Sequence, residues 1–565
     1  MNGQSIRTGA ATLVLCVAAL ALAGCGGEAP KVSRPACPAG KICLEYGNSI
    51  DPGTLDPQKV NLINDATITR AAFEGLYQDD PEGKAIPGLA IDAQTSPDGL
   101  TWTFKLRTAL WSDGEPVTAH DFVYSYRRIL DPGTASAYAY LLYLLKNGQE
   151  INGGKAKPES LGVEAPDDHT LVLHLIHPAP YLPQLLKHQS FYPVPEHTIR
   201  RWGIAWTEPG HLVGDGAYTI NAFRLGDYVR IEKNPRYYDA AKVCVDRIDF
   251  LPVNDAISAE RRVKRGEMDV NDTISSSRVA HLREPGQMRS YVRTHTYLQT
   301  AYVIFNTHVP ALAKRDVRQA LSMSIDRDFL TAKLLRAGQV PAYSFVPPGM
   351  SGYVPDGQRP KPYWYALTFQ QRLAEAKRLL ARAGYGPDHP LKFEMKTSNA
   401  TDSVLLAQAM QADWLSIGVR ASFRQEEGQI MFQDFNIKDF QVGLVSWILD
   451  YDDPLTFLAL MKSDTGPQNY GDFKNPQYDA LLNQADHEVD GVKRAQILAK
   501  AEQIVVDDAD IAPAYYGVNR NLVHPKITGW VDNFADIHSA KYLCAPRTGT
   551  ATGAAASGRV GAVTP

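Results

Sequence analysis

The sequence predicts an α/β protein built from more than one lobe. The chain has 565 residues, well beyond the roughly 250–300 at which single hydrophobic cores stop growing. Strand-like apolar runs also alternate with runs of helical periodicity along its length. Charge is nearly balanced, with 58 Lys and Arg against 62 Asp and Glu, and no long run of one sign occurs. We therefore expect neither nucleic acid nor a charged membrane surface as a partner.

The first 25 residues have the pattern of an export signal of the lipoprotein type. Arg7 and the amino terminus form the positive region, Ala10–Ala23 the apolar core, and the sequence LAGC ending at Cys25 matches a bacterial lipoprotein cleavage box. We expect residues 1–24 to be removed as a signal peptide, Cys25 to be lipidated, and residues 25–37 to form a tether. An ordinary secretory signal or a short membrane anchor is the alternative, although the apolar run is shorter than the ~20 residues that span a bilayer.

Four cysteines follow the lipidation site, and an even number in an oxidising compartment indicates disulfides. They are Cys37, Cys43, Cys244 and Cys544. Three pairings are open, and the short spacing of the first two favours a local loop, which would pair Cys244 with Cys544. A four-cysteine metal site is the alternative, but the spacings lack the paired CxxC knuckles that zinc prefers. We expect no metal and no cofactor.

The stretch from Leu100 to Tyr126 predicts a strand, a turn and a helix in succession. Apolar and polar residues alternate over 100–107, which is typical of a half-buried strand. Ser112-Asp113-Gly114 is a turn sequence, and Thr118 with Asp121 three residues later has the form of a capping box before a helix.

Further strands and helices are predicted along the rest of the chain. The strands are expected at 171–176, 228–232, 419–423 and 440–447, and the helices at 369–383 and 492–506. Thr368 and Gly384 have the residue types of a helix start and stop around 369–383. No internal repeat is evident, and the Gly, Ala and Thr of 546–565 predict a disordered tail.

Acidic residues follow the strand expected at 440–447, whose nearly continuous apolar run indicates burial on both faces. In open α/β sheets, ligands bind beyond the carboxyl ends of the strands. Asp453 has a simple explanation as a helix cap, because Pro454 suits the first helical position. Asp450 precedes that cap, and is therefore our candidate ligand-binding residue.

Several segments resemble one known family. The stretch LTWTFKLRTALWSDGEPVTAHDFVYSY at 100–126 resembles the signature region of extracytoplasmic peptide-binding proteins that serve ABC importers. Six more segments resemble the same family in the same order: LDPQKV at 55–60, FEGLY at 73–77, GDGAYTI at 214–220, KNPRYYD at 233–239, DVRQALSMSIDRD at 316–328 and SWILDYDDP at 446–454. The likeness covers nearly the whole mature chain and is to the extracytoplasmic solute-binding proteins of family 5, in particular the large oligopeptide-binding proteins of the OppA type.

The resemblance implies a two-lobed, periplasmic-binding-protein-like α/β fold of class II, cluster C, with a hinge between the lobes and an extra α/β domain on the first lobe. By this likeness the first lobe is discontinuous, the extra domain follows its first segment, and the second lobe is a single stretch. The implied boundaries are 38–73, 201–299 and 514–545 for lobe I, 74–200 for the extra domain, 300–513 for lobe II and 546–565 for the tail.

The resemblance also implies a binding site. Asp450 matches the acid that pairs with the ligand's α-ammonium. The residues implied along the ligand's main chain are Ser446, Trp447, Ile448, Asn61, Leu62 and Ile63, with backbone groups pairing as an added strand edge. Tyr138 and Trp447 are candidate pocket walls, with a role in the core as the alternative for each. Such contacts ignore ligand side chains, so we expect loose sequence specificity.

The chain departs from the family pattern at the ligand's carboxylate. Where oligopeptide-binding relatives of this type carry basic residues, this chain has Leu444, Phe435 and Thr401. A solvated ligand tail, a ligand without that carboxylate, or another basic residue such as Arg420 or Arg424 would each account for this departure.

The implied function is that of the substrate-binding component of an ABC importer. It would capture peptides with a free amino terminus by hinge closure and deliver them to a permease and ATPase, as a monomer anchored by lipid in the periplasm or at the cell surface. The same fold could instead bind an oligosaccharide, a metal complex or a cell-wall peptide, or report a peptide to a sensor. A secreted hydrolase is a further alternative, but the chain has no GxSxG, HExxH or GxxxxGK[ST] motif, and we expect no enzyme.

Overall fold

The computed structural model describes residues 34–547. The predicted signal peptide, the lipidation of Cys25 and the tail from residue 548 lie outside these residues. The described residues divide between two units, 34–38 and 39–547, and residues 34–38 contain no helix or strand. Within residues 34–547, no helix is both long enough and apolar enough to cross a membrane. The following paragraphs concern the second unit.

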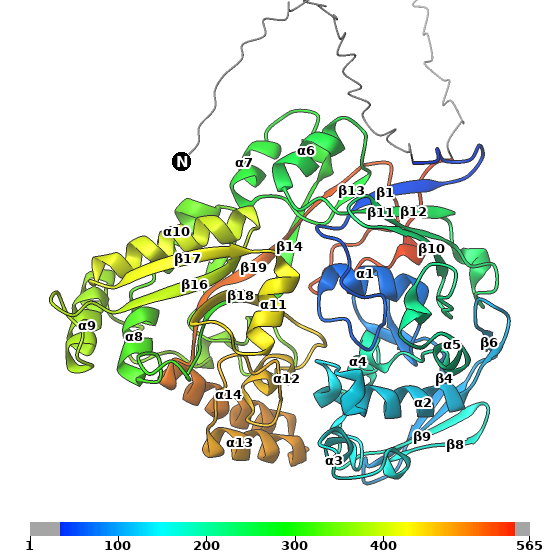
Figure 1. Ribbon diagram of the computed structural model, residues 1–565, viewed down its shortest axis with the longest axis horizontal. Coiled ribbons are helices and arrows are strands. Elements are labelled where there is room, and N and C mark those ends of the chain that lie inside the picture. Colours follow the sequence, from blue (N-terminus) through cyan, green and yellow to red (C-terminus); the bar gives the residue numbers. More distant parts are fainter. Residues whose placement is uncertain (1–33, 548–565) are drawn as a thin grey trace, which may run out of the picture. The chain divides into compact units, whose positions relative to one another are not determined.

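A mixed eleven-stranded sheet extends through the second unit (Figure 1). The strand order is β10-β11-β12-β1-β13-β19-β14-β18-β16-β17, and β15 pairs with β19. The strands are β1 (Cys43–Gly47), β10 (Tyr218–Arg224), β11 (Tyr228–Lys233), β12 (Arg247–Leu251), β13 (Val270–Asn271), β14 (Val292–Phe305), β15 (Val340–Pro341), β16 (Lys392–Ser398), β17 (Arg420–Glu426), β18 (Val442–Ile448) and β19 (Ile511–Val523).

Two long antiparallel strands, β14 and β19, are shared by both halves of this sheet. The end of β19 pairs with β13, and the second half of β14 pairs with β18. Between these halves the β14–β19 register shifts from Thr296 to Thr300, opposite Gly517. A Cβ at Gly517 would lie 2.1 Å from Gln299 Oε1 and 3.0 Å from Gln299 Cβ, so a larger residue here would require the Gln299 side chain to move. The irregular pairing makes this crossing the natural place for the sheet to bend.

Helices cover both halves of the main sheet. They are α1 (Ile63–Ala72), α6 (Ala256–Lys264), α7 (Val279–Leu282), α8 (Arg315–Met323), α9 (Phe369–Arg382), α10 (Thr401–Ser416), α11 (Gly428–Asn436), α12 (Leu455–Leu458), α13 (Pro476–His487) and α14 (Gly491–Asp508). Side chains of β14, β18, α8 and α10 share one apolar core, which includes Val303, Leu444, Leu321 and Trp414. Burial of such side chains drives the association of helices and sheet.

A second sheet lies within the segment expected to form the extra domain. It is antiparallel, with the order β4-β5-β9-β8. Its strands are β4 (Ala90–Thr95), β5 (Thr101–Leu106), β8 (Val163–Asp167) and β9 (Thr170–His174), with the short ladders β2 (Tyr77–Asp79) to β3 (Ala85–Pro87) and β6 (Ala109–Leu110) to β7 (Pro116–Val117) beside it. The helices of this part are α2 (Ala119–Leu130), α3 (Gly148–Asn152), α4 (Leu182–Leu185) and α5 (Glu196–Trp202).

The strands and helices expected from the sequence are present. The capping boxes at Thr118 with Asp121 and at Thr368 with Gln371 start α2 and α9, and the turn at residues 112–114 joins the β6–β7 hairpin. The expected strand at 440–447 is β18, which is buried along most of its length. The end of α9 is also as expected, with Gly384 directly after the C-cap in a left-handed conformation.

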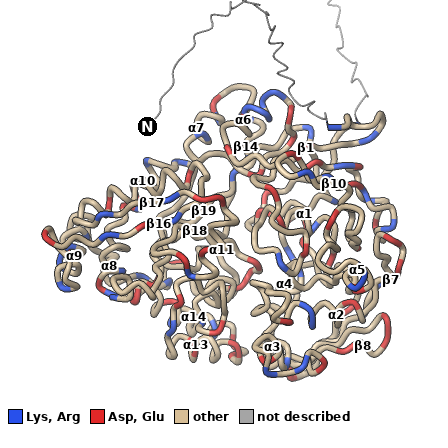
Figure 2. The backbone as a smooth tube through the Cα atoms, viewed as in Figure 1, with Lys and Arg blue, Asp and Glu red and all other residues tan. Residues whose placement is uncertain are grey.

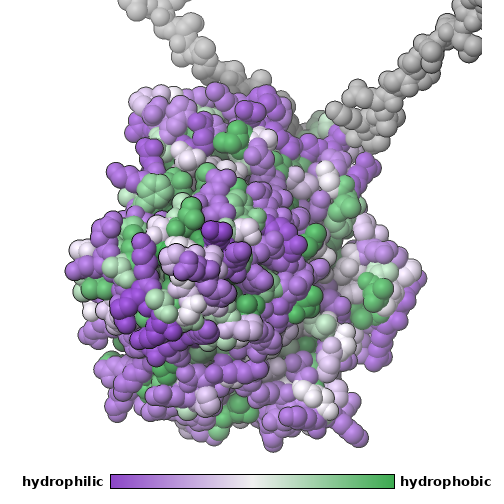
Figure 3. Space-filling view, turned by 60° about the vertical axis from the view of Figure 1, so that its left-hand side comes forward, coloured by the Kyte–Doolittle hydropathy of each residue, from purple (hydrophilic) through white to green (hydrophobic). Residues whose placement is uncertain are grey.

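The surface has no strong charge asymmetry. Figure 2 shows Lys and Arg interspersed with Asp and Glu across the elements of the second unit. On the face drawn in Figure 3, hydrophobic residues are scattered among hydrophilic ones. The distribution of charges in Figure 2 agrees with the nearly balanced composition.

Cys244 and Cys544 form a disulfide with a Cα–Cα distance of 5.3 Å, the pairing that the spacing favoured. Cys37 and Cys43 are also disulfide-bonded, so none of the cysteines in residues 34–547 has a free thiol and the four-cysteine metal site is excluded. The Cys244–Cys544 link closes a loop with a sequence separation of 300 residues, and therefore restricts the unfolded chain strongly in the chain-entropy model.

We predict that replacing Cys244 and Cys544 together by Ser lowers the free energy of unfolding by roughly 2–4 kcal/mol, because the unfolded chain regains loop entropy. Urea denaturation followed by far-UV circular dichroism measures the change. The double variant is preferable to chemical reduction, which would also break the disulfide or disulfides of Cys37 and Cys43. An unchanged denaturation midpoint would contradict a stabilising role for this link.

Candidate ligand-binding pocket

Asp450 stands two residues beyond the end of β18, in a fixed position. The N–H of Leu449 donates to the carbonyl of Leu298 on β14, at 3.0 Å. The N–H of Asp450 then donates to Thr456 Oγ1, at 2.8 Å. The local sequence explains the turn, because Asp453 Oδ1 accepts from the N–H of Leu455 at the start of α12. Asp453 therefore has the capping contact that was expected of it, and it also pairs with Arg494 at 2.7 Å.

The structure brings all eight predicted site residues to one pocket of about 190 Å³. β18 contributes Ser446, Trp447 and Ile448, and the chain that leads into α1 contributes Asn61, Leu62 and Ile63; Tyr138 and Asp450 complete the set. Ile63 is already the first residue of α1, so only the residues before it have the extended backbone that could pair with a strand. Tyr138 and Trp447 are walls of the pocket and also members of the apolar core.

The Asp450 carboxylate is buried, and only one of its two oxygens has a hydrogen-bond partner. Its side chain is 11% exposed. Oδ1 accepts from the Tyr138 hydroxyl at 3.1 Å, whereas Oδ2 is buried and has no hydrogen-bond partner. Buried polar atoms normally have partners, and each exception calls for an explanation. A buried carboxylate oxygen without a partner, in the wall of a pocket, is placed to bind a cation or a hydrogen-bond donor.

The neighbours of Asp450 remain neutral. Burial, followed by the charge of Asp450, raises the pKa of Tyr138 well above its usual value, so the hydroxyl stays a donor. Burial lowers the pKa of His188, although Asp450 opposes this. His188 Nδ1 accepts from the N–H of Ser190, which leaves the proton of the neutral ring on Nε2, 3.6 Å from Asp450 Oδ1. No neighbour in this group therefore supplies a full positive charge to Asp450.

One edge of β18 is unpaired beside the pocket. β14 pairs with the whole of β18 on one side, but β16 pairs with it only at Val442 and Gly443 on the other. Within residues 34–547, no strand pairs with the rest of that edge. The indole Nε1 of Trp447 is also buried without a partner. This part of β18 can therefore accept an extended main chain as an added strand.

Other residues of the pocket were not found by sequence reasoning. They are Ala66, Arg70, His188, Gln189, Phe432, Leu449, Tyr470, Ala535 and Ile537. They come from separate segments, and no local motif marks them. Arg70 is the basic residue of the set, and both its Nε and Nη2 donate to Gln189 Oε1, at 3.2 and 2.9 Å.

The positions that depart from the family pattern do not line this pocket. Leu444 and Phe435 are buried in apolar cores, and Thr401 is the first residue of α10. Arg424 pairs with Glu426 at 2.9 Å, and Arg420, the other alternative, is exposed at the start of β17. Neither arginine lines the pocket.

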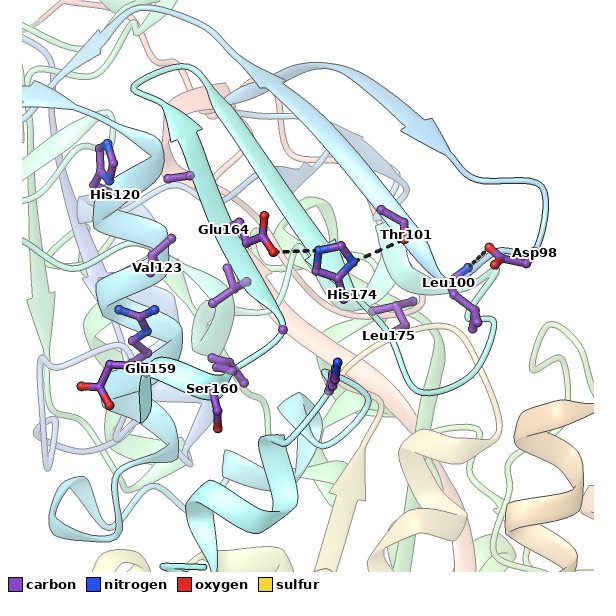
Figure 4. A pocket seen from close by; sticks show the side chains of 16 residues that line it. Asp98, Leu100, Thr101, His120, Val123, Glu159, Ser160, Glu164, His174 and Leu175 are labelled. Carbon is purple, nitrogen blue, oxygen red and sulfur yellow. Dashed lines mark hydrogen bonds and ion pairs between the residues drawn. The ribbon is translucent and has the colours of Figure 1, made fainter. Parts of the chain in front are cut away.

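A larger hollow of about 830 Å³ lies in the predicted extra domain, between α2, β5, β8 and β9 (Figure 4). It is open, and none of the predicted site residues lines it. The figure shows His174 between Glu164, at 3.2 Å, and Thr101, at 3.4 Å. The unpaired carboxylate oxygen of Asp450 and all the predicted site residues lie in the smaller pocket, so we take that pocket as the candidate site.

The chain matches the family model of the bacterial extracellular solute-binding proteins, family 5, over residues 84–469. It belongs to this family. The periplasmic oligopeptide-binding protein OppA of Salmonella typhimurium is 35% identical over 497 residues, which cover 87% of this chain and 90% of that protein. The Haemophilus influenzae OppA complex with the peptide RPPGFSPFR has a TM-score of 0.85 and 30% identity, covering 89% of this chain and 99% of that one.

Two structures of one family member differ in their likeness to this chain. The Escherichia coli murein tripeptide binding protein MppA has a TM-score of 0.86 at 34% identity, covering 90% of this chain and 99% of that one. The unliganded open form of MppA has a TM-score of only 0.63 at 35% identity, with 90% and 98% covered. The second unit therefore has the two-lobed fold of this family.

We predict that His188 makes stability depend on pH. The pKa of His188 is lowered in the folded protein, so the unfolded chain takes up the proton first and stability is lost as pH falls through the unfolded value of about 6.5. Relative to His188→Gln, the wild type should lose free energy of unfolding between about pH 8 and about pH 5. Urea denaturation across this range measures the difference, with exposed His169→Gln as the control. A pH-independent difference between wild type and His188→Gln would contradict the prediction.

Proposed function

We propose that this protein captures peptides with a free amino terminus between its two lobes and delivers them to an ABC importer. The observation that carries the proposal is the buried Asp450 carboxylate, whose Oδ2 has no partner and whose side chain lines the pocket. The peptide-binding names of relatives that cover most of the chain support the same conclusion.

An ammonium group suits the unpaired carboxylate oxygen better than a neutral ligand does. Burying an unpaired charge costs several kcal/mol, and a counter-charge with good hydrogen bonds offsets that cost. The Tyr138 hydroxyl already satisfies Oδ1, so a ligand ammonium at Oδ2 would complete the coordination of Asp450. A sugar hydroxyl could donate there as well but would leave the charge uncompensated, which disfavours an oligosaccharide as cargo.

The main chain of the ligand would lie along the unpaired edge of β18. Ser446, Trp447 and Ile448 present this edge to the pocket, and the buried Nε1 of Trp447 adds a donor for a ligand carbonyl. Asn61 and Leu62 would pair with the other side of the peptide. Because these contacts use backbone groups, the site would accept peptides of varied sequence.

Arg70 is our candidate for the carboxylate end of a short peptide. It lines the pocket and its guanidinium lies against Gln189, an uncharged acceptor, through Nε and Nη2. A guanidinium in this state can bind a carboxylate through its remaining donors. A longer peptide would place its carboxylate outside the pocket.

The lobes and hinge would follow the boundaries given above, with bending at the β14–β19 crossing between Thr296 and Thr300. Residues 74–200 would be the extra domain. The protein would act as a monomer without catalysis, held in the periplasm or at the cell surface by lipid on Cys25, and its partners would be the permease and ATPase of the importer.

We predict that Asp450→Asn weakens binding of a tripeptide with a free amine by at least ~100-fold, because removing one partner of a buried charge pair costs several kcal/mol. Isothermal titration calorimetry of ligand-free protein measures the affinity. Asp452→Asn is the matched control, because Asp452 belongs to the same turn, pairs with Ser351 and does not line the pocket. The N-acetylated tripeptide should bind both proteins with similarly low affinity. Equal affinity of Asp450→Asn and wild type for the free amine would refute the ammonium site.

We further predict that saturating peptide makes the protein more compact in small-angle X-ray scattering, since closure buries the ligand between the lobes. The comparison uses the same preparation before and after addition of a tightly bound peptide. Superimposable profiles would show that capture does not proceed by closure.

A further inference from the structure

Two histidines and an aspartate meet at the hinge, apart from the polar groups of the pocket. The ligand atoms of His295, Asp536 and His538 all lie within 4.8 Å of one another. His295 belongs to β14, one residue before the register shift. Asp536 and His538 belong to the loop that follows β19.

This loop is also a wall of the pocket. Its residues Ala535 and Ile537 line the ligand pocket, whereas the alternate residues Asp536 and His538 supply the cluster. Leu298 of the hinge donates its N–H to the carbonyl of Phe534 at 3.0 Å, so hinge and loop are already in contact. The cluster therefore lies where the hinge strand meets the pocket wall.

His295 is held as a metal-ligating histidine is held. Its Nδ1 lies 3.0 Å from the carbonyl of Thr296, and a ring nitrogen at that distance from a carbonyl oxygen is the one that carries the proton. Its Nε2, which then has the lone pair, is buried and has no partner. Metal-binding histidines characteristically donate one ring N–H to a carbonyl or carboxylate, which orients the other nitrogen toward the metal.

His538 and Asp536 are similarly fixed. His538 Nε2 lies 2.7 Å from Asp536 Oδ1, and the His538 side chain is 3% exposed. The ring stacks on Trp530 with a centroid distance of 3.6 Å, and it lies perpendicular to the ring of His295. A cavity of about 20 Å³ beside Asp536 and His538, which Arg70 also lines and His295 does not, has room for one water molecule.

The surroundings contain further oxygen atoms that lack partners. Asp272 Oδ1 and Asn521 Oδ1 are buried and unpaired, as are both polar side-chain atoms of Asn519. Asn519 lies directly opposite His295 in the β14–β19 ladder, and Asn521 donates to the carbonyl of Asp272 at 3.0 Å. Unpaired buried acceptors near a carboxylate indicate a site for a cation with its bound water.

We propose that His295, Asp536 and His538 form a site for a zinc-class divalent cation, in which the metal fastens the hinge strand to the pocket-wall loop. Two imidazoles and one carboxylate suit Zn²⁺, whereas Mg²⁺ and Ca²⁺ prefer oxygen ligands alone. Water held by the neighbouring acceptors would complete the coordination. On binding, the ring proton that His538 Nε2 donates to Asp536 would move to Nδ1, so that the lone pair of Nε2 and the carboxylate of Asp536 both face the metal.

The test measures Zn²⁺ binding to the purified protein without an affinity tag, after treatment with a chelator. Equilibrium dialysis followed by metal analysis gives the stoichiometry, and competition with a zinc indicator gives the affinity. Co²⁺ substitution gives a second readout, because the intensity of its visible d–d bands distinguishes a four-coordinate protein site from the aqua ion. The variants are His295→Gln and Asp536→Asn. His308→Gln is the matched control, since His308 also pairs with an aspartate, Asp472, at 2.7 Å, on an exposed surface.

We expect one Zn²⁺ per chain for wild type and His308→Gln. Loss of even an outer-shell partner weakens metal binding ~10–100-fold, so loss of a ligand in His295→Gln or Asp536→Asn should weaken it by at least ~100-fold. Zn²⁺ should also raise the melting temperature of the wild type and not that of His295→Gln. Absence of stoichiometric binding to the wild type, or equal binding by wild type and His295→Gln, would overturn the proposal. Peptide affinity of the metal-free protein tests the proposed function separately. Failure of the zinc-site proposal can therefore be distinguished from failure of the peptide-binding proposal.

Discussion

The long antiparallel ladder between β14 and β19 joins the two halves of the main sheet and positions both sides of the pocket. These two strands are the only ones of the described residues whose ladders reach both halves of the main sheet. β18 takes its register from β14, and the turn that carries Asp450 follows β18. The loop that closes the other side of the pocket follows β19. Ladder hydrogen bonds resist shear along the strands, so bending at the crossing is the motion that leaves both halves intact.

The pocket contains a buried carboxylate, Asp450, whose neighbours Tyr138 and His188 supply no counter-charge. Asp450 is held by backbone and hydroxyl contacts, and its neighbours Tyr138 and His188 are kept neutral by burial. An isolated buried charge is unfavourable without a partner. The unpaired carboxylate of Asp450 therefore gives the pocket an affinity for cationic groups. The unpaired edge of β18 beside it then sets the orientation of a bound main chain. Closure around a ligand would then be favoured because it buries a compensated pair.

Many of the helices and strands, and the candidate residue Asp450, could be predicted from the sequence. The remaining pocket residues could not, for a physical reason. The capping box of α2, the N-cap Thr368 of α9 and the alternation in β5 are local signals, and the structure shows them where they were expected. Asp450 could be singled out because it follows a buried strand and precedes a cap. Arg70, His188, Phe432 and Tyr470 could not, because each looks like an ordinary helix, loop or core residue until folding brings them to one pocket. The same holds for His295, which is 241 residues away from Asp536 along the chain (536 − 295), so no spacing motif links them.

Binding of the ligand's ammonium group by Asp450 can be observed in a crystal structure of the protein with a bound tripeptide. We expect the ligand nitrogen within about 3 Å of Asp450 Oδ2, with the peptide backbone paired to the free edge of β18. A bound ligand whose amine lies elsewhere, with Asp450 still bonded only to Tyr138, would contradict it.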